Sequence, residues 1–195
     1  MRNPCRLLCL PLRALLLLSL CCASLPAAAA TDGEATTQAF YGWLLSRPHI
    51  AMPSAAQRKQ LAAFMTPDLI VLLKKTAEAE ARCIAATPEG FKPLLFEGSL
   101  LVGNYEGANE AMYGTWRRTK HAMSVDVDLM AIDDTRPKGH KDRAYRWRDR
   151  VTLRQVGGRW LISDLTLNVS SADRYSLVDY LWKYVRVESL TCGQH

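Results

Sequence analysis

The feature that most constrains the fold is a β-hairpin predicted around Gly157 and Gly158. Residues 144–156 read AYRWRDRVTLRQV and residues 159–167 read RWLISDLTL, and both segments are rich in β-branched and aromatic residues. Two such segments separated by two glycines are a strong pattern for a hairpin with a two-residue turn. Further strands are expected at 111–118 and at 121–132, where apolar and polar residues alternate. The second half of the chain is therefore predicted to form an antiparallel sheet.

The turn fixes a register for this hairpin. Leu153 should face Ile162, and further along Val151 should face Asp164 and Asp149 should face Thr166. Side chains alternate between the two faces of a sheet, so every second residue shares a face. One face is then predicted to carry Trp147, Asp149, Val151, Leu153, Trp160, Ile162, Asp164 and Thr166, and the other Arg146, Arg148, Arg150 and Arg154.

The two aspartates are the unusual members of the apolar face. An ionised carboxylate is costly there unless it is paired or hydrogen-bonded. Asp149 and Asp164, with Trp147 and Trp160, are candidate residues of a ligand-binding pocket, because such pockets are mostly apolar with a few converging polar groups. Crowded carboxylates can also serve as an acid and a base. The structural alternative is that each aspartate accepts hydrogen bonds from backbone N–H groups or an indole and only stabilises the sheet.

The arginines of the opposite face are expected to be solvated or partly covered by a helix. The full chain has 25 basic and 19 acidic residues, but residues 1–30 hold three of the basic ones and no acidic ones, which leaves a net charge of about +3. Nucleic-acid binding would require a more one-sided charge and a recognisable module, and the sequence has neither. We expect no nucleic-acid partner.

Residues 1–30 have the pattern of a secretory signal peptide. Early arginines precede a short apolar segment and then an alanine cluster, with the cleavage site predicted after Ala30. The uninterrupted apolar segment from residue 14 to residue 25 is too short to cross a bilayer core of ~30 Å. The mature chain, residues 31–195, is thus predicted to be a single domain that is periplasmic or secreted, without stable membrane insertion.

Export also determines how the cysteines are interpreted. Four of the six cysteines fall within residues 1–30, so the mature chain keeps only Cys83 and Cys192. Two thiols in an oxidising compartment suggest one disulfide between them. Two unpaired thiols are the alternative. Neither cysteine has a histidine at ligand spacing, and the chain shows no motif for a metal or a cofactor, so we expect none of either.

Helices are predicted before and after the sheet. The first covers TTQAFYGWLLS (36–46) behind a threonine cap, the second begins at Ser54 with a Ser54–Gln57 capping box, and the third runs from Thr66 to Thr87. A late helix, 176–187, has apolar residues on two sides. It is expected to be buried in the core, to close the mouth of a pocket, or to pair with another chain, a second copy included.

Three helices followed by a curved antiparallel sheet ending in GGRWLISDLTL resemble the NTF2-like cone fold. More narrowly, AFYGWLL, PLLFEGSLLVGNYEGAN, YRWRDRVTLRQVGGRWLISDL and YSLVDYL resemble the DUF3828 family of exported bacterial proteins, over about residues 37–181. The resemblance implies an α+β class and an exported location. It carries over no active site, because none is established for that family.

These observations lead to two functional hypotheses. The first is an exported binding module for a small apolar ligand or a protein partner, such as an immunity or accessory protein of the cell envelope. The second is a cofactor-free lyase or isomerase of the NTF2-like type that uses Asp149 and Asp164. The two hypotheses differ in whether those carboxylates reach an open pocket.

Overall fold

The structure is a computed structural model that describes residues 32–47, 49–89, 98–169 and 171–191, with side chains described up to residue 186. The predicted signal peptide, its cleavage site and Cys192 lie outside the described residues. None of the helices in the described part of the chain is long and apolar enough to cross a membrane.

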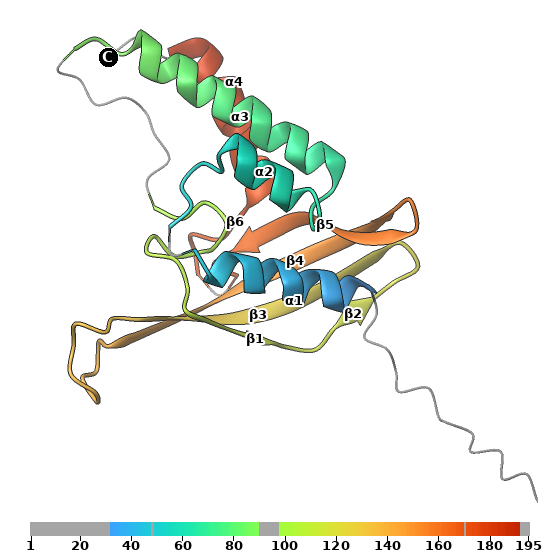
Figure 1. The fold of residues 1–195 in the computed structure, drawn as a ribbon, viewed down its shortest axis with the longest axis vertical. Coiled ribbons are helices and arrows are strands. Elements are labelled where there is room, and N and C mark those ends of the chain that lie inside the picture. The colour runs from blue at the N-terminus through green and yellow to red at the C-terminus, as the bar shows by residue number, and fades with distance from the viewer. Residues whose placement is uncertain (1–31, 48, 90–97, 170, 192–195) are drawn as a thin grey trace, which may run out of the picture.

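The described chain has the predicted α+β class, with three helices followed by an open antiparallel sheet and a final helix (Figure 1). Five of the six strands have the order β1-β3-β4-β5-β6, and the sixth strand, β2, pairs with β3. The helices are α1 (Asp32–Leu45), α2 (Ala55–Leu61), α3 (Pro67–Ala86) and α4 (Leu177–Thr191). The strands are β1 (Glu110–Tyr113), β2 (Arg117–Arg118), β3 (Ala122–Ile132), β4 (Ala144–Val156), β5 (Arg159–Leu167) and β6 (Tyr175–Ser176).

The starts of α2 and α3 lie where the sequence predicts them, although the side chain of Thr66 makes no capping hydrogen bond to α3. Ser54 and the side chain of Gln57 form the reciprocal capping box of α2, and α3 begins at Pro67 after Thr66. The threonine cap predicted for α1 is wrong, because α1 begins at Asp32 and the threonines lie inside it. The hydroxyl of Thr36 instead donates to the carbonyl of Trp160, 3.0 Å away, and so joins α1 to β5.

The β4–β5 hairpin forms as predicted at its turn. Gly157 and Gly158 have φ values of +58° and +80°, and two consecutive positive φ angles are typical of the type I′ turn, which glycine adopts without steric cost. The predicted pairs hold from Val156 opposite Arg159 as far as Leu153 opposite Ile162.

Beyond Leu153 the predicted register is wrong. A β-bulge adds one residue to β5, so that Thr152 faces Asp164 and Val151 faces Leu165. An extra residue on one strand sends each following side chain to the opposite face. Asp164 therefore does not share a face with Asp149.

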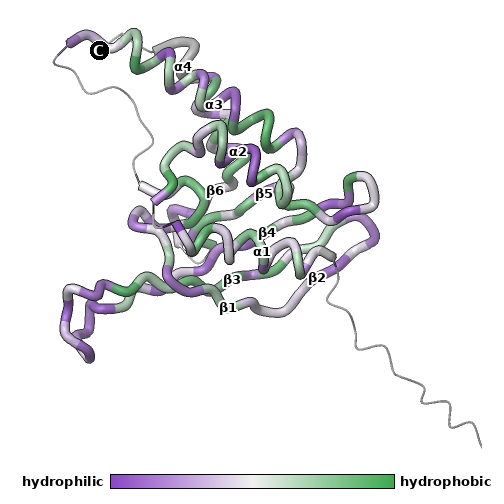
Figure 2. Tube along the Cα trace, viewed as in Figure 1, coloured by the Kyte–Doolittle hydropathy of each residue, from purple (hydrophilic) through white to green (hydrophobic). Residues whose placement is uncertain are grey.

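The core lies between α1 and one face of the sheet, which we call the inner face and which carries Val125, Val127 and Leu129 of β3. Figure 2 shows green and purple alternating along the strands, as expected where one face is buried. The other face, which we call the outer face, carries basic and acidic residues, and the 133–143 connection between β3 and β4 is also rich in polar residues. The buried core includes Phe40, Tyr41, Leu44, Leu61, Met65, Leu69, Leu73, Leu101, Met123, Val151, Leu153, Trp160, Ile162, Leu165, Leu167, Leu177 and Leu181.

Two further strand predictions are resolved by the structure. The segment 111–118 forms two short strands, β1 and β2, rather than one, with Gly114 between them. The alternation predicted for β3 is confirmed, since Met123, Val125, Val127 and Leu129 are buried and the residues between them are partly exposed. The α3–α4 pair lies beyond β5, at one end of the molecule (Figure 1).

Candidate functional site

Asp149 lies on the inner face of β4 and is completely buried, with 0% of its surface exposed. Three groups donate hydrogen bonds to its carboxylate. The backbone N–H of Asn168 donates to Oδ1 over 2.8 Å, and the backbone N–H of Gly103 and the indole of Trp147 donate to Oδ2 over 2.9 and 3.3 Å. Both carboxylate oxygens are thus occupied by donors from this protein.

Burial dominates the electrostatics of this carboxylate. Desolvation raises the pKa of Asp149 from 3.8 to about 6, against the opposing effect of the three donors. Its negative charge also acts on two phenols: burial and then Asp149 raise the pKa of Tyr41, and burial, Tyr180 and Asp149 raise the pKa of Tyr175 to about 12. Tyr41 is itself fully buried, and its hydroxyl has no hydrogen-bond partner among the described residues.

The surroundings of Asp149 leave no room for a ligand at its oxygens. A Cβ placed on Gly103 would lie 2.5 Å from Oδ1 of Asp149 and 2.8 Å from the backbone nitrogen of Asn168. This close approach requires glycine at position 103. Asn168 in turn has a φ of +53°, a left-handed conformation that asparagine tolerates better than most residues. Asp149 therefore connects the 98–109 loop to the end of β5.

Asp164 has a different role at the opposite face. Its Oδ1 accepts hydrogen bonds from the backbone N–H groups of Leu165, 2.8 Å away, and of Val178, 3.1 Å away. Val178 lies in the first turn of α4, whose unpaired N–H groups favour an acidic acceptor. Partial burial raises the pKa of Asp164, while the hydrogen bonds from Ser176, Val178 and Leu165 oppose this rise. Asp164 holds the start of α4 against β5.

The two tryptophans predicted for the pocket lie in the core. Trp147 is 6% exposed and Trp160 is 3% exposed. A Cβ on Gly33 of α1 would lie 2.5 Å from the sulfur of Met123 and 3.2 Å from the Cβ of Trp160, so α1 packs directly onto this part of the inner face. The structure thus brings Trp147 to Asp149, and it does not bring Trp160 or Asp164 into one pocket with them.

The outer face carries a ladder of arginine–aspartate pairs that the alternating sequence did not reveal by itself. Arg148 binds both oxygens of Asp128 over 2.6 and 3.1 Å, and Arg150 binds both oxygens of Asp126 over 2.6 and 3.2 Å. Arg117 of β2 adds a third contact to Asp126, at 2.9 Å. Hydrogen bonds from Arg150 contribute most to lowering the pKa of Asp126 to about 2. The register explains these pairs, because Asp126 and Asp128 lie directly opposite Arg150 and Arg148.

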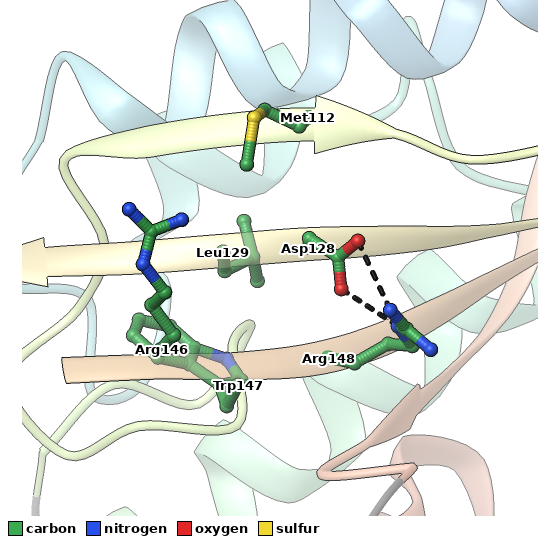
Figure 3. A pocket seen from close by; sticks show the side chains of 6 residues that line it. All are labelled: Met112, Asp128, Leu129, Arg146, Trp147 and Arg148. Atoms are coloured by element: carbon green, nitrogen blue, oxygen red, sulfur yellow. Dashed lines mark hydrogen bonds and ion pairs between the residues drawn. The ribbon is translucent and has the colours of Figure 1, made fainter.

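The ladder ends at a shallow hollow of about 400 Å³ on the outer face (Figure 3). Met112, which is 51% exposed, borders the hollow on β1, and Arg146 and the Asp128–Arg148 pair border it on β3 and β4. The side chains of Leu129 and Trp147 lie behind the strands in this view, so strand backbone forms the floor. Arg146 faces Met130 instead of an aspartate, and no ion pair joins it to any part of the chain that the structure describes. We call Arg146 and Met112, with the hollow between them, the Arg146 hollow.

The arrangement defines an α+β domain with a closed inner face and an open, charged outer face. No group of three His, Cys, Asp or Glu side chains in the described ranges is placed to hold a metal ion. No family model, no curated protein and no solved structure matches the chain. Cys83 is buried on α3, and its predicted bridge to Cys192 stays a prediction.

Proposed function

We propose that the mature chain is an exported binding module that docks a protein partner on the outer face of its sheet, at the Arg146 hollow. One observation carries the proposal. Arg146 is the member of the outer-face arginine series for which the described chain supplies no acidic partner, and it borders a hollow beside a half-exposed methionine. Exposed apolar and arginine side chains that lie together are enriched in protein interfaces.

The partner that fits this site offers a carboxylate next to an apolar side chain. The guanidinium of Arg146 can bind a carboxylate through two parallel hydrogen bonds, while Met112 adapts its unbranched side chain to an apolar neighbour. Asp126 and Asp128 do not repel such a group strongly, because Arg148, Arg150 and Arg117 already neutralise them. Glu110 lies in the same row of the sheet as Met130 and Arg146, at its exposed edge, and is the one acidic residue of this row.

A ligand on the inner face of the sheet has less support. Asp149 is fully buried with both oxygens occupied, and α1 packs against Trp160 without a gap. The alternative of a lyase or isomerase requires Asp149 and Asp164 to reach one substrate. These residues lie on opposite faces of the sheet and accept hydrogen bonds from different segments, so we do not retain this alternative.

We also propose that the protein is exported and that it belongs to the family that its sequence resembles. Three helices followed by an antiparallel sheet whose last long hairpin turns at two glycines are consistent with an NTF2-like cone, and with membership of the DUF3828 family. An accessory or immunity role in the cell envelope would use an open sheet face in this way. Residues 1–30 would be removed before the protein acts.

Site-specific photo-crosslinking tests the proposal. A photo-reactive benzoylphenylalanine is placed at position 112 in the exported protein, and the matched control carries it at Ile84, an exposed apolar residue of α3. We expect a discrete crosslinked species from position 112 that Arg146→Glu removes and Arg146→Lys weakens, and no such species from position 84. Crosslinking that is equal at both positions, or that survives Arg146→Glu, would show that the partner does not dock at the Arg146 hollow.

A further inference from the structure

A second exposed surface lies at the α3–α4 end of the molecule, away from the Arg146 hollow. Trp182 of α4 is 40% exposed, whereas Trp147 and Trp160 are buried. Cations from two helices approach its ring: Nζ of Lys75 lies 5.7 Å from the ring centre, and Cζ of Arg186 lies 5.9 Å from it. A partly exposed indole with two cations near its ring combines a large apolar area with positive charge.

The described side chains around Trp182 are mostly basic. A hollow of about 370 Å³ beside the ring is lined by Asp179, Trp182, Lys183 and Arg186. Lys75 of the neighbouring helix also approaches the ring, so the side chains described near it are three basic ones and one carboxylate. Neither Lys75 nor Lys183 forms an ion pair within the described chain, and Lys74 pairs instead with Glu78. We call Lys75, Trp182, Lys183 and Arg186 the Trp182 cluster.

We propose that the Trp182 cluster docks the protein onto the anionic phospholipid headgroups of a membrane surface. Tryptophan is the side chain that favours the boundary between headgroups and acyl chains, because its ring is apolar and its N–H stays hydrogen-bonded to water or lipid. Lys75 and Lys183 then meet lipid phosphates, to which each basic residue near the surface adds about a fivefold increase in partitioning. Basic residues beside an aromatic on one helix face are typical of such interfacial binding.

The position of the cluster in the fold suits a flat surface. The α3–α4 pair extends beyond β5 at one end of the molecule, so it can approach a membrane before the sheet does (Figure 1). The interaction is peripheral, because α4 carries Asp179, Lys183 and Arg186 on its exposed side and buries Leu177 and Leu181 in the domain core. The Arg146 hollow would remain open on a docked molecule, so this inference does not depend on the proposed partner site.

Vesicle co-sedimentation tests this inference on the chain without residues 1–30. We use vesicles of phosphatidylcholine alone and vesicles with about a third phosphatidylglycerol, at low and high salt. The wild-type protein should bind the anionic vesicles at low salt and should bind the neutral vesicles much more weakly. Lys183→Glu should weaken anionic binding at least about fivefold, Lys183→Arg should preserve it, and Trp182→Ala should weaken it at both salt concentrations.

Lys141→Glu is the matched control, because it makes the same substitution at an exposed lysine of the 133–143 connection, away from the α3–α4 end (Figure 1). It should leave vesicle binding within about twofold of wild type. Circular dichroism should show equal thermal midpoints for the Lys183 and Lys141 variants, and should show that Trp182→Ala is still folded at the assay temperature. An equal loss from Lys141→Glu and Lys183→Glu would mean that net charge alone is responsible. That result, equal binding to both vesicle types, or no binding to either, would overturn the proposal.

Discussion

Replacing Asp149 by asparagine tests which effect on the pKa of this carboxylate is stronger: burial on the inner face, which raises it, or hydrogen bonding, which lowers it. Burial penalises the ionised carboxylate, while the N–H groups of Asn168 and Gly103 and the indole of Trp147 favour it. Burial is the stronger of the two, so the folded pKa of Asp149 is about 6, above its usual value of 3.8. Asparagine has nearly the same shape and does not titrate in this range.

The raised pKa determines both the sign and the size of the effect. The folded state binds the proton of Asp149 more tightly than the unfolded state does, so the stabilisation from this group is complete below pH 3.8 and is lost as the pH rises through about 6. A pKa of about 6 in place of 3.8 corresponds to about 3 kcal/mol. Above about pH 7 the contribution should be constant. The unfolded carboxyl is already about half ionised at pH 4, so the Asp149→Asn variant should gain about 2 kcal/mol of this relative to wild type between pH 4 and pH 7.

The assay is urea unfolding of both proteins at several pH values, with the difference in unfolding free energy plotted against pH. The introduced amide would have to turn its NH2 toward a backbone or indole donor, at a cost of roughly 1–3 kcal/mol that does not vary with pH. This cost is the same at every pH, so it does not change how the stability difference varies with pH. Asp126, whose lowered pKa gives the opposite pH dependence, is present in both proteins, so its effect cancels in the difference. Asp134→Asn, at a carboxylate that is 83% exposed, is the control and should change stability by less than about 0.5 kcal/mol. A difference that is flat, or that falls as the pH rises, would refute the dominance of burial.

Three further predictions concern the termini and α4. N-terminal sequencing of the exported protein should begin at Thr31, and recovery of the uncleaved chain in membranes would contradict the predicted signal peptide. Thiol titration of the unfolded, unreduced protein should find no free thiol if Cys83 and Cys192 are bridged, whereas two reactive thiols would exclude the bridge. Asp164→Ala should lower the unfolding free energy by about 1–2 kcal/mol and speed amide hydrogen exchange in the first turn of α4, because that turn loses its acceptor. Unchanged exchange at Val178 would show that Asp164 does not cap the helix.

The sequence predicted the local elements of the fold well where one residue decides the backbone. Two consecutive glycines specify the hairpin turn, and Pro67 after Thr66 marks the start of α3. Alternation then predicted which side chains of β3 are buried. These predictions depend only on neighbours in the chain, so they did not require knowledge of the packing.

The bulge in β5 could not be predicted in the same way. Its sequence, Ile162-Ser163-Asp164-Leu165, contains no glycine, and a regular strand would accommodate it as well. The bulge becomes favourable through contacts that are distant in the chain. It places Leu165 in the core and brings Asp164 to the N–H of Val178, and the Ser163 hydroxyl bonds the carbonyl of Thr152 over 3.2 Å.

The surroundings of the candidate site residues could not be predicted for a related reason. The sequence places Asp149 on the apolar face of its strand, but the donors that satisfy Asp149 come from Gly103 and Asn168, which no pattern in β4 reveals. Part of the outer face could have been predicted from the sequence. Asp126 and Asp128 alternate on β3 as the arginines do on β4, and pairing these strands would have shown that Arg146 lacks an acidic partner there.

The bulge therefore separates the roles of the two faces. With Asp164 on the outer side and Asp149 enclosed, the described strands place one carboxylate on the inner face, and its donors fix the 98–109 loop. On the outer face, β4 presents a series of arginines, and each arginine opposite an aspartate of β3 forms an ion pair with it. Arg146 differs only because Met130 occupies the next outward position of β3. An acidic residue there would close the ladder and leave no charge for a partner, so Met130→Asp should abolish crosslinking from position 112 while it preserves the fold.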